Sequence, residues 1–164
     1  MANQPRVYQI AVKDSHKTEK RGHGLGKISV ERLVVNVTGC EGDFNKYRTD
    51  HKDSTNDRAV SIMTKQLLTD LTNEGWGHIM PGDLGENITT DGRITFEIGG
   101  IYSVGSVLLQ ITENIEPCNK LIYLPYIKKE RKNDFLKTLK GRRGWYAKVL
   151  NEGIIFPGDK IIIK

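Results

Sequence analysis

The amino-acid sequence predicts a mainly β fold with a few helices around its strands. Many short runs of apolar and β-branched residues are separated by turns rich in glycine and proline, and only two stretches show convincing helical periodicity. Short strands at regular spacing are typical of a barrel or a sandwich. A chain of 164 residues is long enough for one domain with its own core, so we expect a single domain over residues 1–164.

The first third of the chain is expected to hold two strands and two loops. Val7 to Val12 alternates in hydropathy, and residues 28–37 are rich in β-branched side chains, as half-buried strands are. Residues 14–27 are charged and glycine-rich and are read as a loop. Residues 39–57 form a second long loop, and loops of this length in a compact domain are usually functional or disordered.

A buried strand followed by a capped helix is expected next. Residues 58–63 are read as the strand, Thr64 is placed to cap the helix, and Gly75 ends it. The apolar face of this helix consists of Leu67, Leu68 and Leu71.

The second half of the chain is expected to contain most of the short strands. A turn-rich segment at 81–92 leads into a strand, and a second amphipathic helix at about 125–139 is expected to cover the sheet with its apolar residues and to face solvent with its lysines. Further strands are predicted at 94–98, 101–104, 107–112, 145–150, 154–156 and 160–163.

The charge points toward anionic partners. The net charge is +5 and the pI is near 9.2, but the basic residues are scattered and not interleaved with aromatics, which does not favour nucleic acid. A phosphate-bearing small cofactor would need few of them. No apolar run approaches the roughly 20 residues that span a bilayer, and residues 1–5 do not resemble a signal peptide, so we expect a cytoplasmic protein without membrane contact.

The thiol of Cys118 is the strongest candidate for a chemical site. It lies in Pro117-Cys118-Asn119-Lys120, directly after the strand-like residues 107–112. A thiolate can bind a soft metal or carry sulfur as a persulfide, and a neighbouring ammonium group favours the thiolate form. The alternative is an inert, buried cysteine. The second cysteine, Cys40, begins a loop, and a reducing cytosol directs attention to thiol chemistry and away from a disulfide.

Six short motifs in one order resemble the MOSC domain, a family named for the C-terminal domain of molybdenum cofactor sulfurase. The resemblance extends from Val7 to Lys164 and is greatest to the small stand-alone bacterial members. The motifs are Gly42-Asp43, Arg58-Ala59-Val60-Ser61, Pro81-Gly82-Asp83-Leu84-Gly85-Glu86-Asn87-Ile88, Pro117-Cys118-Asn119-Lys120, Gly144-Trp145-Tyr146-Ala147-Lys148-Val149 and Gly153 to Pro157-Gly158-Asp159.

The resemblance implies a closed β-barrel with a few peripheral helices. It also implies a protein that binds molybdenum cofactor (molybdopterin), with Cys118 as molybdenum ligand and catalytic residue. The activity expected from similar proteins is the reduction of N-hydroxylated compounds such as 6-N-hydroxylaminopurine. Because the chain has no flavin or nicotinamide fingerprint, the electrons would come from a separate donor protein.

Five further residues are expected to contact the cofactor. The phosphate needs fixed donors, and the basic residues nearest the motifs are Lys120, Arg58, Arg142 and Arg143. The amide of Asn87 is a candidate for contact with pterin or substrate. The alternatives are that Arg58 pairs with Asp43 or Asp57, that the two neighbouring arginines are solvated, and that Asn87 only closes a turn.

Two other functions remain open at this point. One is a sulfur carrier in which Cys118 holds a persulfide for a metal-sulfur centre, with a sulfurase as partner. The other is a basic barrel that binds nucleic acid and has an inert Cys118. Pyridoxal phosphate is connected with this chain by family association alone, because some relatives are joined to a pyridoxal-phosphate sulfurase domain.

Overall fold

The computed structural model describes residues 3–13, 26–44 and 55–164, and it confirms the mainly β fold with a few helices. The helices are α2 (Lys65–Asn73) and α3 (Lys132–Leu139), with short 3₁₀ turns η2 (Asn56–Arg58), η3 (Asn119–Tyr123) and η4 (Lys129–Arg131). The strands are β1 (Arg6–Val12), β2 (Ile28–Ser29), β3 (Leu33–Asn36), β4 (Gly39–Cys40), β5 (Val60–Thr64), β6 (Ile88–Asp91), β7 (Ile101–Val104), β8 (Val107–Asn114), β9 (Trp145–Asn151), β10 (Gly153–Ile155) and β11 (Ile161–Ile163). In this part of the chain, no helix has the length and apolarity needed to cross a membrane.

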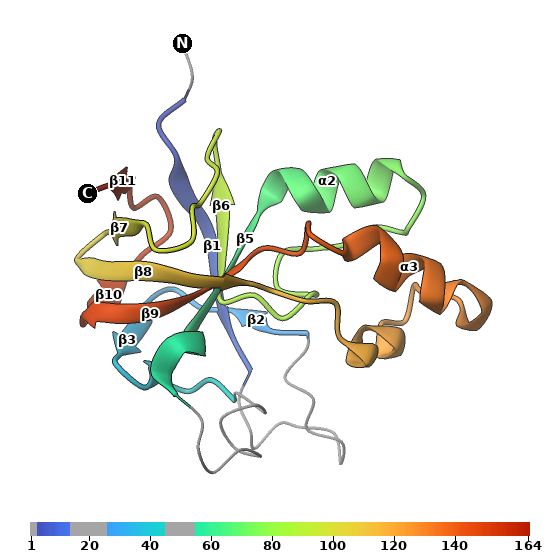
Figure 1. The fold of residues 1–164 in the computed structure, drawn as a ribbon, viewed down its shortest axis with the longest axis horizontal. Coiled ribbons are helices and arrows are strands. Elements are labelled where there is room, and N and C mark those ends of the chain that lie inside the picture. The colour runs from blue at the N-terminus through green and yellow to red at the C-terminus, as the bar shows by residue number, and fades with distance from the viewer. Residues whose placement is uncertain (1–2, 14–25, 45–54) are drawn as a thin grey trace.

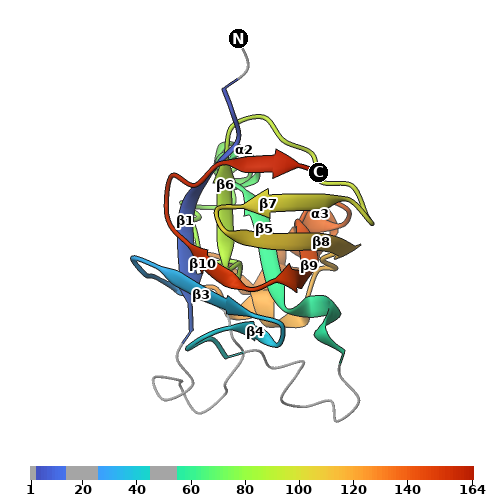
Figure 2. The same cartoon turned by 90° about the vertical axis from the view of Figure 1, so that its left-hand side faces the viewer.

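The strands form two sheets, with both helices on one side of them. The larger sheet has the order β11-β7-β8-β9-β5-β6-β1-β2, and the smaller has the order β10-β3-β4. All neighbours in the larger sheet are antiparallel except β5 and β6, which are parallel because α2 makes the crossover between them. Figures 1 and 2 show α2 and α3 together, on the side of the sheets away from the C-terminus.

The closed barrel expected from the sequence is not confirmed, because the strand ladders stop short of a ring. Between β1 and β11 the connection is a single antiparallel bridge, Arg6 opposite Lys160. Backbone hydrogen bonds from Val7 N to Asp159 O (2.9 Å) and from Gly158 N to Val7 O (2.7 Å) support it. Ile161 N, at the start of β11, donates to Pro5 O just before β1, and no further pairs of residues extend this ladder among the described strands.

The helix predicted after residues 58–63 is confirmed, although the strand begins two residues later, at Val60. The Thr64 hydroxyl accepts a hydrogen bond from Leu67 N at 3.3 Å, which caps α2. All three predicted leucines of α2 are buried, and Gly75 has the positive φ of 87° that ends such helices.

Three other predicted elements differ from those observed. The run 28–37 is divided between the two sheets, because β2 pairs with β1 whereas β3 pairs with β10. Residues 94–98 form no strand, yet their alternation still buries Phe96, whose ring lies edge-on to Tyr102 at 4.8 Å. The helix predicted at 125–139 is shorter, because α3 begins at Lys132 after the single turn η4.

The buried residues form two clusters that meet at β5. One cluster lies between the sheets and includes Ile62 and Ala147. The other lies between the larger sheet and the helices and includes Met63, Phe135 and Leu139. Ile62 and Met63, neighbours on β5, contribute to opposite clusters, so this strand is buried on both faces.

The register of β8 and β9 brings two distant segments together. Asn114 lies opposite Trp145, and Ile115 N donates to Gly144 O at 2.8 Å. The residues that follow β8 therefore run beside those that precede β9. Gly144 is required here, because its φ is 119° and a Cβ would lie 2.3 Å from Ile62 O.

A buried polar network around Asn87 fastens β1 and β5 together. The Asn87 amide nitrogen donates to Ala11 O (3.2 Å) and to Asp43 Oδ2 (2.9 Å). Its amide oxygen accepts from Ser61 N and Ser61 Oγ, both at 3.1 Å. Asp43 in turn forms an ion pair with Lys27 at 2.6 Å, and these two side chains are only 7 % and 5 % exposed. Removal of one partner would leave the other as an uncompensated buried charge.

Glu86 folds back on the turn that precedes it. Its Oε1 accepts hydrogen bonds from Gly82 N (2.7 Å) and Thr89 Oγ1 (3.1 Å), and Oε2 has no partner among the described residues. Burial raises the pKa of Glu86, and the hydrogen bonds from Gly82 and Thr89 oppose this shift. Burial outweighs these hydrogen bonds, so the folded protein favours the protonated carboxyl.

Asn87→Ala is expected to lower the free energy of unfolding by about 3 kcal/mol, because Ser61, Asp43 and Ala11 O lose buried hydrogen bonds. Chemical denaturation measures the change. Asn133→Ala, at an exposed site on α3, is the control and should stay within about 0.5 kcal/mol of wild type. An unchanged Asn87→Ala protein would favour the ligand role expected from the sequence.

Glu86→Gln is expected to gain stability relative to wild type as pH rises. A carboxyl with a raised folded-state pKa stabilises the fold below its unfolded pKa, and that contribution is lost as pH rises through the folded pKa. Gln cannot ionise, so the difference should grow from pH 5 upward, by at most about 1.4 kcal/mol per pH unit. Urea unfolding at several pH values, with exposed Glu97→Gln as control, measures it; a constant difference would contradict the buried-carboxyl account.

Candidate functional site

Cys118 lies half-buried at the start of a short helical turn. The chain leaves β8 at Asn114 and reaches Cys118 in an extended conformation, with φ −113° and ψ 138°. Cys118 caps η3, because its Sγ accepts from Lys120 N at 3.5 Å and its carbonyl accepts from Leu121 N at 3.0 Å. The sulfur thus takes part in capping the turn.

Arg143 fixes the segment that carries Cys118. Its side chain is buried, with Nη1 donating to Glu116 O and Nη2 donating to Leu84 O, each at 2.9 Å. It therefore ties the residues before Cys118 to the turn containing Glu86. Burial lowers the pKa of Arg143, while Tyr146, Cys118 and Glu86 act in the opposite direction.

Arg143 and Glu86 each retain one unsatisfied polar atom. Within the described residues, the buried side-chain atoms without a hydrogen-bond partner are Arg143 Nε and Glu86 Oε2. Buried polar atoms are almost always paired, because an unmade hydrogen bond costs about 1–3 kcal/mol. Arg143 contacts the Cys118 segment through Glu116 O, and it also binds the carbonyl of Leu84, two residues before Glu86.

Tyr146 and Arg58 complete the surroundings of the thiol. The Arg58 guanidinium carbon is 5.2 Å from the centre of the Tyr146 ring, and Arg58 forms an ion pair with Glu113 in which Nη2 and Oε2 are 3.2 Å apart. Burial raises the pKa of Tyr146; the charges of Arg143 and Arg58 lower it, and Cys118 raises it. The net effect is a raised pKa, so the phenol stays protonated at neutral pH.

The six residues expected from the sequence do not all lie together. The Lys120 amide donates to Cys118 Sγ, Arg143 holds Glu116 O two residues before Cys118, and Arg58 lies over the Tyr146 ring. The sequence left open a pairing of Arg58 with Asp43 or Asp57, whereas its observed ion pair is with Glu113.

Arg142 and Asn87 are occupied elsewhere. Arg142 is exposed and forms a bidentate pair with Glu74, with Nη2 to Oε1 at 2.7 Å, and this pairing lowers the pKa of Glu74. Asn87 uses both amide hydrogens within the network around Asp43, and no described hydrogen bond joins it to Cys118.

Tyr146, Glu113 and Glu86 were not identified as site residues from the sequence. Tyr146 and Glu86 stand within quoted motifs, so the motifs contained a signal for them. Glu113 carries no local signal, because its meeting with Arg58 depends on the pairing of β8 with β9 and of β9 with β5.

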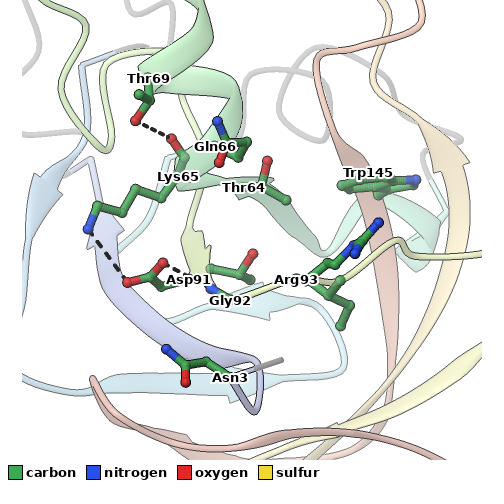
Figure 3. A pocket seen from close by; sticks show the side chains of 11 residues that line it. Asn3, Thr64, Lys65, Gln66, Thr69, Asp91, Gly92, Arg93 and Trp145 are labelled. Carbon is green, nitrogen blue, oxygen red and sulfur yellow. Dashed lines mark hydrogen bonds and ion pairs between the residues drawn. The ribbon is translucent and has the colours of Figure 1, made fainter. Parts of the chain in front are cut away.

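A separate cavity of about 760 Å³ opens on the face of β9 opposite to Tyr146 (Figure 3). Trp145 lines it and Tyr146 does not, as expected for neighbouring residues of one strand. Thr64 and Lys65 enter from the start of α2, and Arg93 extends toward Trp145. Cys118 does not line this cavity, which is therefore distinct from the site around the thiol.

Neither cysteine is in a disulfide. Cys40 is buried in the cluster between the sheets, whereas Cys118 is accessible at the edge of the fold. Over residues 3–13, 26–44 and 55–164, no group of three or more His, Cys, Asp and Glu side chains is arranged to hold a metal ion.

Several solved structures share this fold. YiiM from Geobacillus stearothermophilus is 25% identical, with a TM-score of 0.73, over 98% of this chain and 75% of that protein. YuaD from Bacillus subtilis is 18% identical, with a TM-score of 0.75, over 98% of this chain and 96% of that protein. YiiM from Escherichia coli is 22% identical, with a TM-score of 0.64, over 100% of this chain and 70% of that protein.

The sequence itself identifies the family. A search of the curated proteins found no match. The model of the MOSC domain, however, matches residues 48–162, which include β5 to β10 and every residue placed around the thiol above. The chain therefore belongs to the MOSC domain family.

Proposed function

We propose that this protein binds molybdenum cofactor through Cys118 and reduces N-hydroxylated compounds. The observation that carries this proposal is the half-buried thiol at the N-terminus of η3, with the cationic side chains of Arg143 and Arg58 and the phenol of Tyr146 around it. Membership of the MOSC family, whose members are associated with molybdenum cofactor, supports the choice of metal.

The donor set around Cys118 suits a cofactor that brings most of its own ligands. A metal already held by the two sulfurs of a pterin dithiolene accepts a further soft ligand, and a thiolate is such a ligand. The cofactor is anionic, and the guanidinium groups of Arg58 and Arg143 supply positive charge at this site. Arg143 is buried, so its charge acts at a distance, whereas Arg58 is exposed enough to form charge-assisted hydrogen bonds with an anionic group.

The residues of the site take different roles in this proposal. Cys118 is the ligand, and Lys120 orients it because the Lys120 amide donates to the sulfur. Arg58, with its side chain about one-third exposed, is the cation that a phosphate can reach. Arg143 positions the thiol through Glu116 O. Arg142 and Asn87 support the fold through Glu74 and Asp43.

The reaction consumes two electrons and two protons for each N–OH bond converted to N–H, and it releases one water. When bound, the cofactor supplies the two-electron chemistry. Tyr146 can hold a proton near the thiol, because its phenol is protonated at neutral pH. The electrons come from a separate donor protein.

Cys118→Ala is expected to abolish retention of molybdenum and pterin by protein purified from molybdate-supplied cells, because the one soft ligand is removed. Metal analysis and pterin fluorescence measure the content. Cys40→Ala is the control, since it removes a thiol that lies in the core between the sheets and should leave the content unchanged. Wild type is then assayed for reduction of 6-N-hydroxylaminopurine with dithionite as electron source.

Two outcomes would overturn the molybdenum proposal. Well-folded wild type without cofactor, from cells able to make it, would favour the sulfur-carrier function. In that function the Cys118 thiolate attacks a donor persulfide, accepts its outer sulfur and releases the donor thiolate; mass spectrometry would detect the extra sulfur on Cys118. Equal cofactor content in both cysteine variants would show that neither thiol is the ligand.

Arg143→Lys is expected to weaken cofactor retention about tenfold, or about 1.4 kcal/mol, because one ammonium cannot hold both Glu116 O and Leu84 O in place. Molybdenum remaining after dialysis measures retention, and the thermal midpoint shows whether the variant is folded. Arg142→Lys, one residue away and paired with Glu74, is the matched control. Equal retention in the two variants would contradict a positioning role for Arg143.

A further inference from the structure

The net positive charge of this protein is concentrated directly after Cys118. Residues 119–143 contain nine Lys and Arg and two Asp and Glu, a net charge of +7. The rest of the chain contains sixteen basic and eighteen acidic residues, a net charge of −2. Such an uneven distribution of charge produces an electrostatic field that steers a charged partner to one face of a protein.

The fold gathers this charge at one end of the molecule. η4 and α3 lie together at the helical end, away from both termini (Figure 1). Lys128, Lys129, Lys137 and Lys140 are exposed, Lys132 is half-buried, and no described ion pair joins any of them to an acid. These five lysines are called the basic surface.

Other cations of the same segment are used within the protein. Arg131 lies over the Trp76 ring, with its guanidinium carbon 4.0 Å from the ring centre, and Arg142 pairs with Glu74. The five lysines have no such use among the described contacts. Unpaired ammonium groups at this density repel one another, and an acidic partner relieves that repulsion.

The basic surface is firmly connected to the thiol site. Phe135 and Leu139 of α3 and Leu121 of η3 are buried in the same cluster. Cys118 caps η3, so α3 packs against the turn that holds the sulfur. A protein docked on these lysines would lie beside the segment that carries Cys118.

We infer that the basic surface docks an acidic electron-transfer protein that supplies the two electrons of the reduction. This inference rests on the proposed function, because only a reductase needs such a donor. Electrostatic docking of this kind raises the association rate and makes it depend on salt.

The side chains favour a protein over nucleic acid. The described aromatic rings of this region are withdrawn from the surface: Trp76 and Phe135 are buried, and the Tyr126 hydroxyl donates to Asp83 Oδ2 at 3.2 Å. Single-stranded nucleic acid uses exposed rings for stacking. Glu130 and Asp134 also stand among the lysines, where a phosphate backbone would be repelled.

The test compares two triple variants with the same change of net charge. Lys128→Glu, Lys129→Glu and Lys137→Glu reverse the basic surface, and the control reverses three exposed cations outside it, Arg32→Glu, Lys160→Glu and Lys164→Glu. The probe is a reduced flavodoxin, a small acidic electron carrier. Stopped-flow absorbance follows its oxidation by cofactor-loaded protein with 6-N-hydroxylaminopurine present, from about 20 to about 300 mM NaCl.

We expect wild type and control to react faster as salt is lowered. The basic-surface variant should be at least about tenfold slower at low salt and nearly independent of salt. All three proteins should turn over equally with dithionite, which needs no docking. An equal slowing of the control, or a salt-independent wild type, would overturn the inference.

A second measurement separates failure of docking from failure of the proposed function. Amide shifts of labelled wild type, as purified, are recorded during titration with flavodoxin and, separately, with a single-stranded RNA. Shifts confined to residues 128–140 with flavodoxin support docking even if dithionite drives no turnover, in which case the reductase proposal fails. Turnover without these shifts, or tighter binding of RNA at the same amides, would overturn the docking inference.

Discussion

The pairing of β8 with β9 decides where Cys118 lies and what surrounds it. With Asn114 opposite Trp145, the chain leaving β8 and the chain entering β9 run side by side for several residues. Arg143 can then reach Glu116 O although the two are far apart in sequence. Gly144 permits the close approach to β5 that this register demands. A change in register would separate the thiol from its neighbouring cations.

Buried polar groups connect this register to the rest of the fold. Arg143 binds the turn that contains Leu84, and that turn is closed by Glu86 and leads to Asn87, which fastens β1 to β5. Such groups contribute little net stability when satisfied, but they cost much when left unpaired. They therefore specify one arrangement of the strands around the thiol, and within the described residues Glu86 and Arg143 each leave one buried atom without a partner.

Elements defined by residues close in sequence could be predicted, whereas elements defined by distant partners could not. Thr64, the spaced leucines and Gly75 define α2 almost completely, because capping and periodicity act within a few residues. Residues 28–37 look like one strand, but their partners belong to different sheets. Arg142 and Arg143 are chemically identical neighbours, yet one is exposed and the other buried. That difference depends on Glu74 and Glu116, which only the tertiary fold brings near.

The single bridge between Arg6 and Lys160 gives the molecule a seam. From β11 to β1 the order of strands is β11-β7-β8-β9-β5-β6-β1, so β9 is the middle strand, with three on either side. Local opening of a sheet is easiest where few hydrogen bonds hold its strands. Opening at the seam would have to pass β11 and β7 on one side, and β1, β6 and β5 on the other, before it reached the two strands that flank the thiol segment.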